Sequence, residues 1–341
     1  MAYSVPCVPS PNFHVAMRKI DFTLYLISLI LGGAGGWIIS RWGIRLSLMD
    51  HPNERSSHST VTPKGGGIGI LAAFLFCSLY TKISYWFWAP ATGVSVLGLF
   101  TDRFEISPQT RLIIQFIAVI VAVIGIGRIS LSEINEIMLI VFFTFYIVGT
   151  GNYYNFMDGI NGIAGITGIV GFGLIGFYAF FLKIDSSFVI LATSISFACL
   201  GFLPFNMPKA RVFMGDVGSI LLGFVFAGMV VFLSRNLLDF ICMAGFLFPF
   251  YADELLTMMI RIRDGEKLSK PHRRHLYQLL ANEYRISHWK VSLGYGLFQL
   301  IIGISVLLLK STGITAVISL FILYFCAFTI LSSILRKRLK Y

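Results

Sequence analysis

The sequence predicts an all-α integral membrane protein, and three observations carry this prediction. Apolar residues make up 56% of the 341 residues, charged residues only 13%, and the mean hydropathy is +0.80. Soluble domains contain about 25% charged residues. The apolar residues also gather in stretches close to the roughly 20 residues that cross a bilayer as a helix. This composition excludes a disordered chain, which has few apolar residues, and predicts a single polytopic domain over residues 1–341.

Eleven apolar stretches are predicted to be spanning helices, because a backbone inside hydrocarbon must satisfy its own hydrogen bonds. In chain order, they cover residues 20–40, 66–81, 85–100, 112–127, 136–150, 162–182, 187–206, 217–234, 238–260, 291–309 and 313–335. Several are short for a span, so we expect tilted neighbours or a locally thinner bilayer around them.

Basic residues predict how these helices are oriented. Twenty of the 27 Lys and Arg residues follow the odd-numbered stretches. Since positive residues concentrate on the cytoplasmic side, the N-terminus is predicted outside and the C-terminus inside. The net charge of +11 has the same explanation, so we expect no nucleic-acid partner. The predicted cytoplasmic loops, at residues 43–66, 101–111, 151–161, 207–216 and 261–290, hold most of the polar side chains and are the expected place of any chemistry.

The first two loops each allow two interpretations. Lys64 followed by Gly65, Gly66 and Gly67 resembles an anion cradle, in which backbone N–H groups approach a phosphate. The alternative is a turn that enters a tightly packed helix. Asp102, at the exit of the third stretch, is either a functional carboxylate or a solvated helix end.

The third loop places Asn152, Asn155, Asp158 and Asn161 at every third position. A helical turn would bring them roughly onto one face, so three amides and one carboxylate could form a polar ligand site. A plain connecting loop is the alternative.

The fourth and fifth loops suit phosphate chemistry. Glycines on both sides leave Asp216 open to a hard cation such as Mg²⁺, which takes one or two protein carboxylates beside water and phosphate oxygens. Arg273 and His275 lie in a dense cationic segment that suits an anionic ligand, although it could also simply orient the protein in the membrane. Carboxylates, amides and cations on one membrane face together predict phosphoryl transfer between a soluble nucleotide and a molecule in the bilayer.

Three segments resemble a known family. Asn155-Phe-Met-Asp158-Gly-Ile-Asn161-Gly, Phe213-Met-Gly-Asp216-Val-Gly-Ser and His272-Arg-Arg-His275-Leu-Tyr-Gln are similar to motifs of the polyprenyl-phosphate N-acetylhexosamine-1-phosphate transferases, called glycosyltransferase family 4. The opening Asp50-His-Pro-Asn-Glu-Arg-Ser-Ser-His and the closing motif resemble the branch that starts O-antigen or similar surface glycans. The five loops match in order, from about Asp50 to Gln278.

The resemblance implies an enzyme of the bacterial inner membrane with a cytoplasmic active site. It would transfer a sugar phosphate from a UDP-N-acetylhexosamine (UDP-GlcNAc, UDP-FucNAc or UDP-QuiNAc type) to undecaprenyl phosphate and release UMP. Mg²⁺ would be the cofactor, with Mn²⁺ as an alternative. The oligomeric state stays open, a homodimer being one option. The implied residues are, as catalytic groups, Asp102, Asp158 and Asp216; as metal ligands, Asp216 and Asp102; as substrate-binding groups, Lys64, Asn152, Asn155, Asn161, Arg273 and His275.

One departure from the family pattern bears on mechanism. Where the family usually has two adjacent aspartates, this chain has Thr101 and Asp102. A mechanism that passes through a covalent aspartyl phosphate at position 101 is therefore excluded. A direct displacement is predicted instead, in which Thr101 binds a water or phosphate oxygen. The alternative is a homologue that binds lipid phosphate or nucleotide without turnover.

A membrane transporter is the alternative from another class. Transporters place ionisable groups near the middle of the bilayer. All sixteen acidic residues are expected in loops or within a few residues of a helix end, which disfavours a transporter.

Overall fold

The computed structural model describes residues 20–52, 57–104, 106–126, 134–267 and 272–339, and confirms an all-α protein. The long helices are α1 (Ile20–Trp42), α2 (Ile68–Tyr80), α3 (Tyr85–Arg103), α4 (Pro108–Gly125), α5 (Ile134–Phe156), α6 (Ile163–Phe181), α7 (Ser186–Asn206), α8 (Asp216–Leu233), α10 (Phe248–Arg263), α12 (His288–Leu309) and α13 (Ile314–Arg338). The shorter elements are α9 (Leu237–Ala244), η2 (Gly245–Leu247), α11 (Leu276–Gln278), η3 (Leu279–Glu283), η4 (Lys310–Thr312) and the antiparallel pair β1 (Met49–Asp50) and β2 (Thr62–Pro63).

Each of the eleven predicted stretches falls on a helix. Within the described ranges, nine helices are long and apolar enough to cross a membrane, the run Leu237–Arg263 counting as one of them. The 13-residue α2 is too short, and α3 is not among the nine. The predicted external N-terminus lies in residues 1–19, outside the described part of the chain.

Two loops are shorter than predicted. Helix α5 continues to Phe156, into the expected loop 151–161, and α4 already begins at Pro108. The start of α4 is fixed by Ser107, whose side chain accepts a hydrogen bond from the backbone N–H of Thr110 at 3.1 Å, and by proline at the first helical position. The polar residues near these two helix ends are therefore held on helices and tight turns.

Helix α8 forms the centre of the molecule. Almost all of its residues are buried, and it packs against α3 and α5, while α7 packs against α1 and α6. Small residues allow these helices to approach closely. A Cβ at Gly201 of α7 would lie 1.9 Å from the carbonyl oxygen of Leu29 in α1, closer than any side chain could be tolerated.

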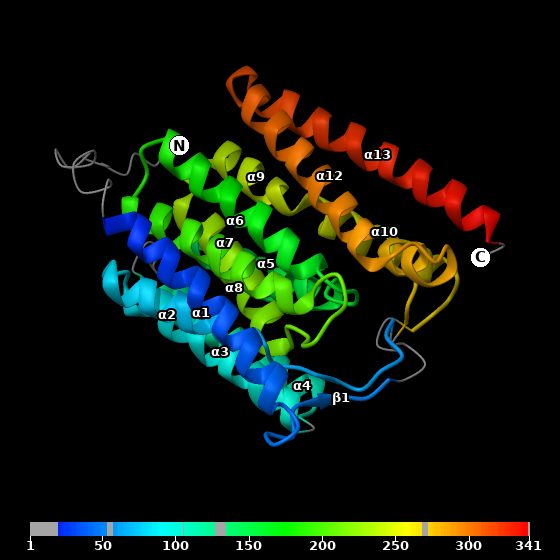
Figure 1. Cartoon of the computed structure of the whole chain (residues 1–341). Coiled ribbons are helices and arrows are strands. Elements are labelled where there is room, and N and C mark those ends of the chain that lie inside the picture. Colours follow the sequence, from blue (N-terminus) through cyan, green and yellow to red (C-terminus); the bar gives the residue numbers. More distant parts are fainter. Residues whose placement is uncertain (1–19, 53–56, 105, 127–133, 268–271, 340–341) are drawn as a thin grey trace.

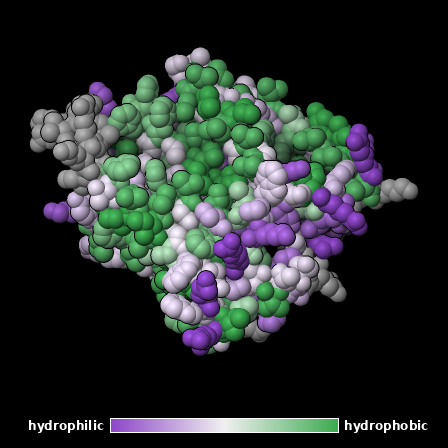
Figure 2. All heavy atoms as spheres, viewed as in Figure 1, coloured by the Kyte–Doolittle hydropathy of each residue, from purple (hydrophilic) through white to green (hydrophobic). Residues whose placement is uncertain are grey.

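The surface separates into apolar and polar parts. In Figure 1 the long helices run roughly side by side, with α13 at one edge of the molecule. Figure 2 shows hydrophobic residues over much of the same face, and hydrophilic residues gathered toward the end where β1, α10 and the start of α12 lie. Large apolar side chains are exposed on α4, α5, α12 and α13, as expected where helices face lipid.

One sequence-based expectation about acidic residues is wrong. Asp253 and Glu254 lie well inside the continuous run Leu237–Arg263, and both are buried. They therefore do not belong to a loop, although they lie in the half of that run that leads to the His272–Gln278 segment. Most of the other carboxylates lie near helix ends, as predicted.

Candidate active site

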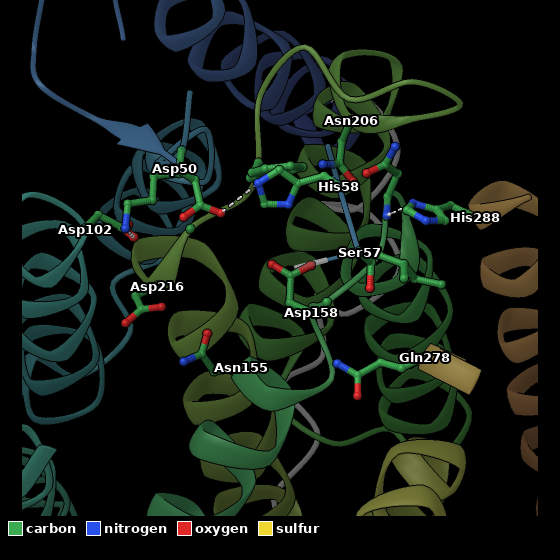
Figure 3. A pocket seen from close by; sticks show the side chains of 16 residues that line it. Asp50, Ser57, His58, Asp102, Asn155, Asp158, Asn206, Asp216, Gln278 and His288 are labelled. Atoms are coloured by element: carbon green, nitrogen blue, oxygen red, sulfur yellow. Dashed lines mark hydrogen bonds and ion pairs between the residues drawn. The ribbon is translucent and has the colours of Figure 1, made fainter. Parts of the chain in front are cut away.

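A cavity of about 300 Å³ lies where the ends of several helices meet (Figure 3). Its lining comes from the segment before α2 and from the facing ends of α3, α5, α8 and α12, with α11 and the α5–α6 turn completing it. The lining residues are Asp50, Ser57, His58, Lys64, Asp102, Asn155, Asp158, Gly159, Ile160, Asn161, Asn206, Phe213, Gly215, Asp216, Gln278 and His288. Six of the nine residues singled out in the sequence are among them.

Asp216 is the first residue of α8, at the positive end of the helix dipole. Its Oδ2 accepts a hydrogen bond from Arg111 Nη2 at 2.6 Å and lies 3.1 Å from the hydroxyl of Thr101. The Thr101 hydroxyl can instead donate to the carbonyl oxygen of Gly98 at 2.8 Å. Thr101 therefore contacts the Asp216 carboxylate directly, in addition to any ligand oxygen it could bind.

Asp102 belongs to the last turn of α3, lies beside Asp216 of α8, and is almost fully buried. Its Oδ1 is 3.8 Å from Lys64 Nζ, and its Oδ2 accepts from the backbone N–H of Val217 at 3.4 Å. Glycine is required next to it: a Cβ at Gly215 would lie 2.5 Å from Asp102 Oδ2, and Gly215 has a φ of +75°. Glycine before Asp216 thus lets the two carboxylates approach.

The glycines after Lys64 do not form the anion cradle that the sequence allows. The backbone N–H groups of Gly66 and Gly67 donate to the carbonyl oxygens of Phe213 and Met214, both at 2.9 Å. A Cβ at Gly67 would lie 2.4 Å from Gly218 Cα. The alternative interpretation is therefore the one that fits: these glycines let the start of α2 pack against the start of α8.

The amide-rich segment is divided between a helix and a turn. Asn155, on the last turn of α5, accepts a hydrogen bond from the hydroxyl of Ser219 at 2.7 Å. Asp158 and Asn161 follow in the turn before α6, and all three line the cavity. Burial, together with the nearby carboxylates Asp216 and Asp102, raises the pKa of Asp158.

Asn152 does not share this face. Its side-chain amide donates to Gln115 Oε1 at 2.7 Å and to the carbonyl oxygen of Val148 at 2.8 Å, so it joins α5 to α4. Because α5 ends at Phe156, the three-residue spacing does not continue as one helical face, and the expectation of four aligned polar groups is wrong for Asn152.

Arg273 and His275 also lie outside the cavity lining. Arg273 Nη2 is 4.0 Å from Glu283 Oε1, with its side chain partly exposed. His275 is buried, with Nε2 3.3 Å from Glu254 Oε2. Burial and the nearby Arg336 and Arg261 lower the pKa of His275 to about 3, so the imidazole is neutral at pH 7. Neither residue lines the cavity, whereas Gln278, at the end of the same motif, does.

Sequence comparisons show which proteins this chain is similar to. The model of the family described as Glycosyl transferase family 4 matches residues 84–234. A probable undecaprenyl-phosphate N-acetylglucosaminyl 1-phosphate transferase of Bacillus subtilis is 27% identical over 84% of each chain. An undecaprenyl-phosphate alpha-N-acetylglucosaminyl 1-phosphate transferase of Thermotoga maritima is 26% identical over 75% of this chain and 80% of its own. A phospho-N-acetylmuramoyl-pentapeptide-transferase of Staphylococcus saprophyticus is 41% identical over 32% of this chain and 35% of its own. These matches support the resemblance to glycosyltransferase family 4 that the sequence motifs indicate.

Several cavity residues were not singled out in the sequence. They are Ser57, His58, Asn206, Gln278 and His288, together with Arg111 beside the cavity. His58 and Gln278 belong to segments that carry the family resemblance, so those segments contained a usable indication. Arg111 appears in the sequence only as one of many basic residues, because its partner Asp216 is 105 positions away.

Proposed function

We propose that this protein transfers an N-acetylhexosamine 1-phosphate from a UDP-sugar to undecaprenyl phosphate and releases UMP. The observation that carries the proposal is the cavity itself. It brings Asp102, Asp158 and Asp216 together with Lys64 and three asparagines at the ends of membrane helices. The relatives whose names state transfer to undecaprenyl phosphate support the acceptor.

The two carboxylates Asp102 and Asp216 fit Mg²⁺, with Mn²⁺ as an alternative. Within the described ranges no group of three or more His, Cys, Asp or Glu side chains could hold a metal ion by itself. Mg²⁺ bound with a nucleotide needs only one or two protein carboxylates, since water and phosphate oxygens complete its shell. When bound, Mg²⁺ would neutralise charge on the diphosphate. Lys64 and Arg111 form ion pairs with the same two carboxylates.

The remaining residues suit a direct displacement. A lipid phosphomonoester has a second pKa near 6, so it is mostly dianionic at pH 7 and needs no general base. Lys64 and Arg111 would offset the negative charge around the transferred phosphoryl group. Asn155 and Asn161, with Asp158 between them, would orient the nucleotide by hydrogen bonds. Thr101 would hold the Asp216 carboxylate in place.

The proposal includes orientation and pathway. With the N-terminus outside, the cavity would open at the cytoplasmic face of a bacterial inner membrane, where it can reach soluble UDP-sugars. The reaction would then be the first step of lipopolysaccharide O-antigen or another surface polysaccharide. Both relatives named as N-acetylglucosaminyl 1-phosphate transferases make UDP-GlcNAc the first donor to test, before the UDP-FucNAc and UDP-QuiNAc types.

A transfer assay tests the proposal. Purified protein in detergent is mixed with undecaprenyl phosphate, Mg²⁺ and UDP-GlcNAc, UDP-FucNAc or UDP-QuiNAc labelled in the sugar. We expect butanol-soluble label and an equal amount of UMP, loss of both with EDTA, and recovery with excess Mg²⁺. Asp216→Asn is the inactive control. Absence of product with every donor, although the protein still binds undecaprenyl phosphate or UDP, would instead support a non-catalytic homologue.

A further inference from the structure

The segment His272–Gln278 needs support from elsewhere in the fold. Its only helix, α11, has three residues and continues directly into η3, and so short a helical stretch is marginal by itself. Yet Gln278, the last residue of α11, lines the cavity, and Leu276, the first residue of α11, is buried. Something outside the segment must therefore fix its position.

Asp253 of α10 provides this support. Its Oδ1 accepts a hydrogen bond from the backbone N–H of Leu276 at 2.8 Å, and its Oδ2 accepts one from that of Tyr277 at 3.2 Å. Backbone N–H groups in the first turn of a helix have no partner within the helix. A carboxylate from a different helix therefore satisfies the two N–H groups with which α11 begins.

The same carboxylate also joins α12. Its Oδ2 accepts a hydrogen bond from the hydroxyl of Tyr295 at 2.7 Å, and Thr257 donates to its Oδ1 at 3.3 Å. Asp253 is 0% exposed, so these bonds are made away from water. Burying a carboxylate that has no hydrogen-bond partners would cost much free energy. The hydrogen bonds of Asp253 therefore favour one relative placement of the three elements that it joins, α10, α11 and α12.

Through Tyr277, the arrangement reaches a second wall of the cavity. The Tyr277 hydroxyl donates to the carbonyl oxygen of Phe156 at 2.9 Å, two residues before Asp158. A Cβ at Gly159 would lie 2.2 Å from this hydroxyl, so the Asp158–Asn161 turn packs directly on Tyr277. Moving α11 would therefore displace both Gln278 and the turn that carries Asp158.

We propose that Asp253 is a positioning residue for the transfer reaction. It does not line the cavity; its two hydrogen bonds from backbone N–H groups fix α11, and α11 in turn fixes Gln278 and the Asp158 turn. The expected effect on kinetics rests on the proposed function. The expected effect on the stability of α11 does not depend on it.

Three variants in the full-length protein separate the roles. Asp253→Asn keeps the volume but leaves one of the N–H groups facing an NH₂ group. Tyr295→Phe removes only the bond from α12 and leaves both α11 bonds. Asp239→Asn is the matched control: Asp239 is an equally buried carboxylate, 2.7 Å from Tyr178 Oη, 2.9 Å from Arg235 Nε and 2.8 Å from Lys310 Nζ, and it does not line the cavity.

The measurements are hydrogen–deuterium exchange and steady-state kinetics in the same detergent. In Asp253→Asn we expect faster exchange in peptides covering 272–284 and 157–162. We also expect kcat/KM to be lower by about 10- to 100-fold, the usual range for residues that hold the site residues in place without touching the ligand. Asp239→Asn should lower the unfolding midpoint without changing exchange in these two peptides or the kinetics. Tyr295→Phe should retain slow exchange at 276 and 277.

Unchanged exchange at residues 276 and 277 in Asp253→Asn would overturn the proposal, even if the protein proves inactive with every substrate. Normal kcat and KM in that variant, with an active wild type, would also overturn it. A loss of kcat/KM of the same size in Asp239→Asn would mean that activity reports general stability, and would equally contradict a specific role for Asp253. An inactive wild type with the expected exchange pattern would reject the proposed function and leave the positioning of α11 intact.

Discussion

Thr101 stands where the family that this chain resembles usually has an aspartate, and its contact with Asp216 defines a test. Its hydroxyl lies 3.1 Å from Asp216 Oδ2, whereas Arg111 donates to the same oxygen at 2.6 Å. A hydrogen bond to a charged group contributes about 1.5 kcal/mol or more, and Arg111 still holds the same oxygen in the variant, so Thr101→Ala should lower kcat by about 10-fold. Asp216→Ala should lower it by about 100-fold or more, because a charged group at the reacting phosphates is removed.

Both variants are to be compared in single-turnover transfer assays at saturating donor. Thr101→Ser, which keeps the hydroxyl, serves as the matched control and should resemble the wild type. If Thr101→Ala is as inactive as Asp216→Ala, Thr101 takes part in the reaction directly, and the supporting role assigned to it is wrong.

Asp158 offers a prediction about stability. Burial and two neighbouring carboxylates raise its pKa, so the folded protein binds this proton more tightly than the unfolded chain. The charged carboxylate therefore destabilises the fold above pH 4, increasingly as the pH rises toward the folded-state pKa. Asp158→Asn should raise the midpoint of thermal unfolding, by more at pH 8 than at pH 5, while transfer activity is lost.

Asp264→Asn is the control for this comparison. Hydrogen bonds from Arg274 and Arg263 lower the pKa of Asp264, so its amide variant should not raise the midpoint at either pH. A lower midpoint for Asp158→Asn at both pH values would show that the carboxylate stabilises the fold.

At the residue scale, the sequence indicated the three carboxylates that line the cavity but not the ion pairs that the cations form with them. Asp102, Asp158 and Asp216 each lie next to a helix end or glycine, a local pattern that a reader can see. The ion pairs of Lys64 with Asp102 and of Arg111 with Asp216 join residues 38 and 105 positions apart, and no local pattern indicates them. The contact of His275 with Glu254 joins residues 21 positions apart and is likewise not indicated by any local pattern.

At the scale of elements, glycines control how closely helices approach. Gly201 of α7 contacts the backbone of α1, and since the carbonyl oxygen of Leu29 cannot move aside as a side chain could, α1 would have to shift. Gly201→Ala should therefore destabilise the protein, by about 1–3 kcal/mol if it behaves as other overpacked sites do. The measurement is the thermal unfolding midpoint in detergent.

Gly93→Ala in α3 is the matched control, because nothing lies within 4 Å of a Cβ at this position. Alanine favours helix more than glycine does, so this variant should unfold at the same temperature or higher. Equal midpoints for the two alanine variants would contradict the close packing of α1 against α7.

Helix existence could be predicted from composition, whereas helix ends could not. All eleven apolar stretches are helices, because length and hydropathy alone decide whether a segment can lie in hydrocarbon. The end of α5 and the start of α4 were misjudged. Residues 151–156 continue α5, which ends at Phe156, and residues 108–111 belong to α4, which starts after Ser107. Three-residue spacing then suggested one face for Asn152 and Asn161, although the helix stops between them.

On the scale of the whole molecule, the cavity gathers residues from the segment between α1 and α2 and from α3, α5, α7, α8 and later helices. Their ends must therefore reach the same membrane face. Charge predicts which face this is, because the loops near the cavity hold most of the basic residues. The η4 turn lies at the other end of α12, so it is expected on the outside of the cell.

Accessible cysteines test this orientation. We place Thr312→Cys in η4 and Arg263→Cys at the end of α10, both exposed positions, in a chain whose Cys7 and Cys326 are serine. In intact cells a membrane-impermeant maleimide should label Thr312→Cys, whereas Arg263→Cys should react only after the membrane is permeabilised. The parent chain, with its remaining cysteines buried, corrects for background. The reverse labelling pattern would place the cavity outside the cytoplasm, away from soluble UDP-sugars, and would remove the donor on which the proposed reaction depends.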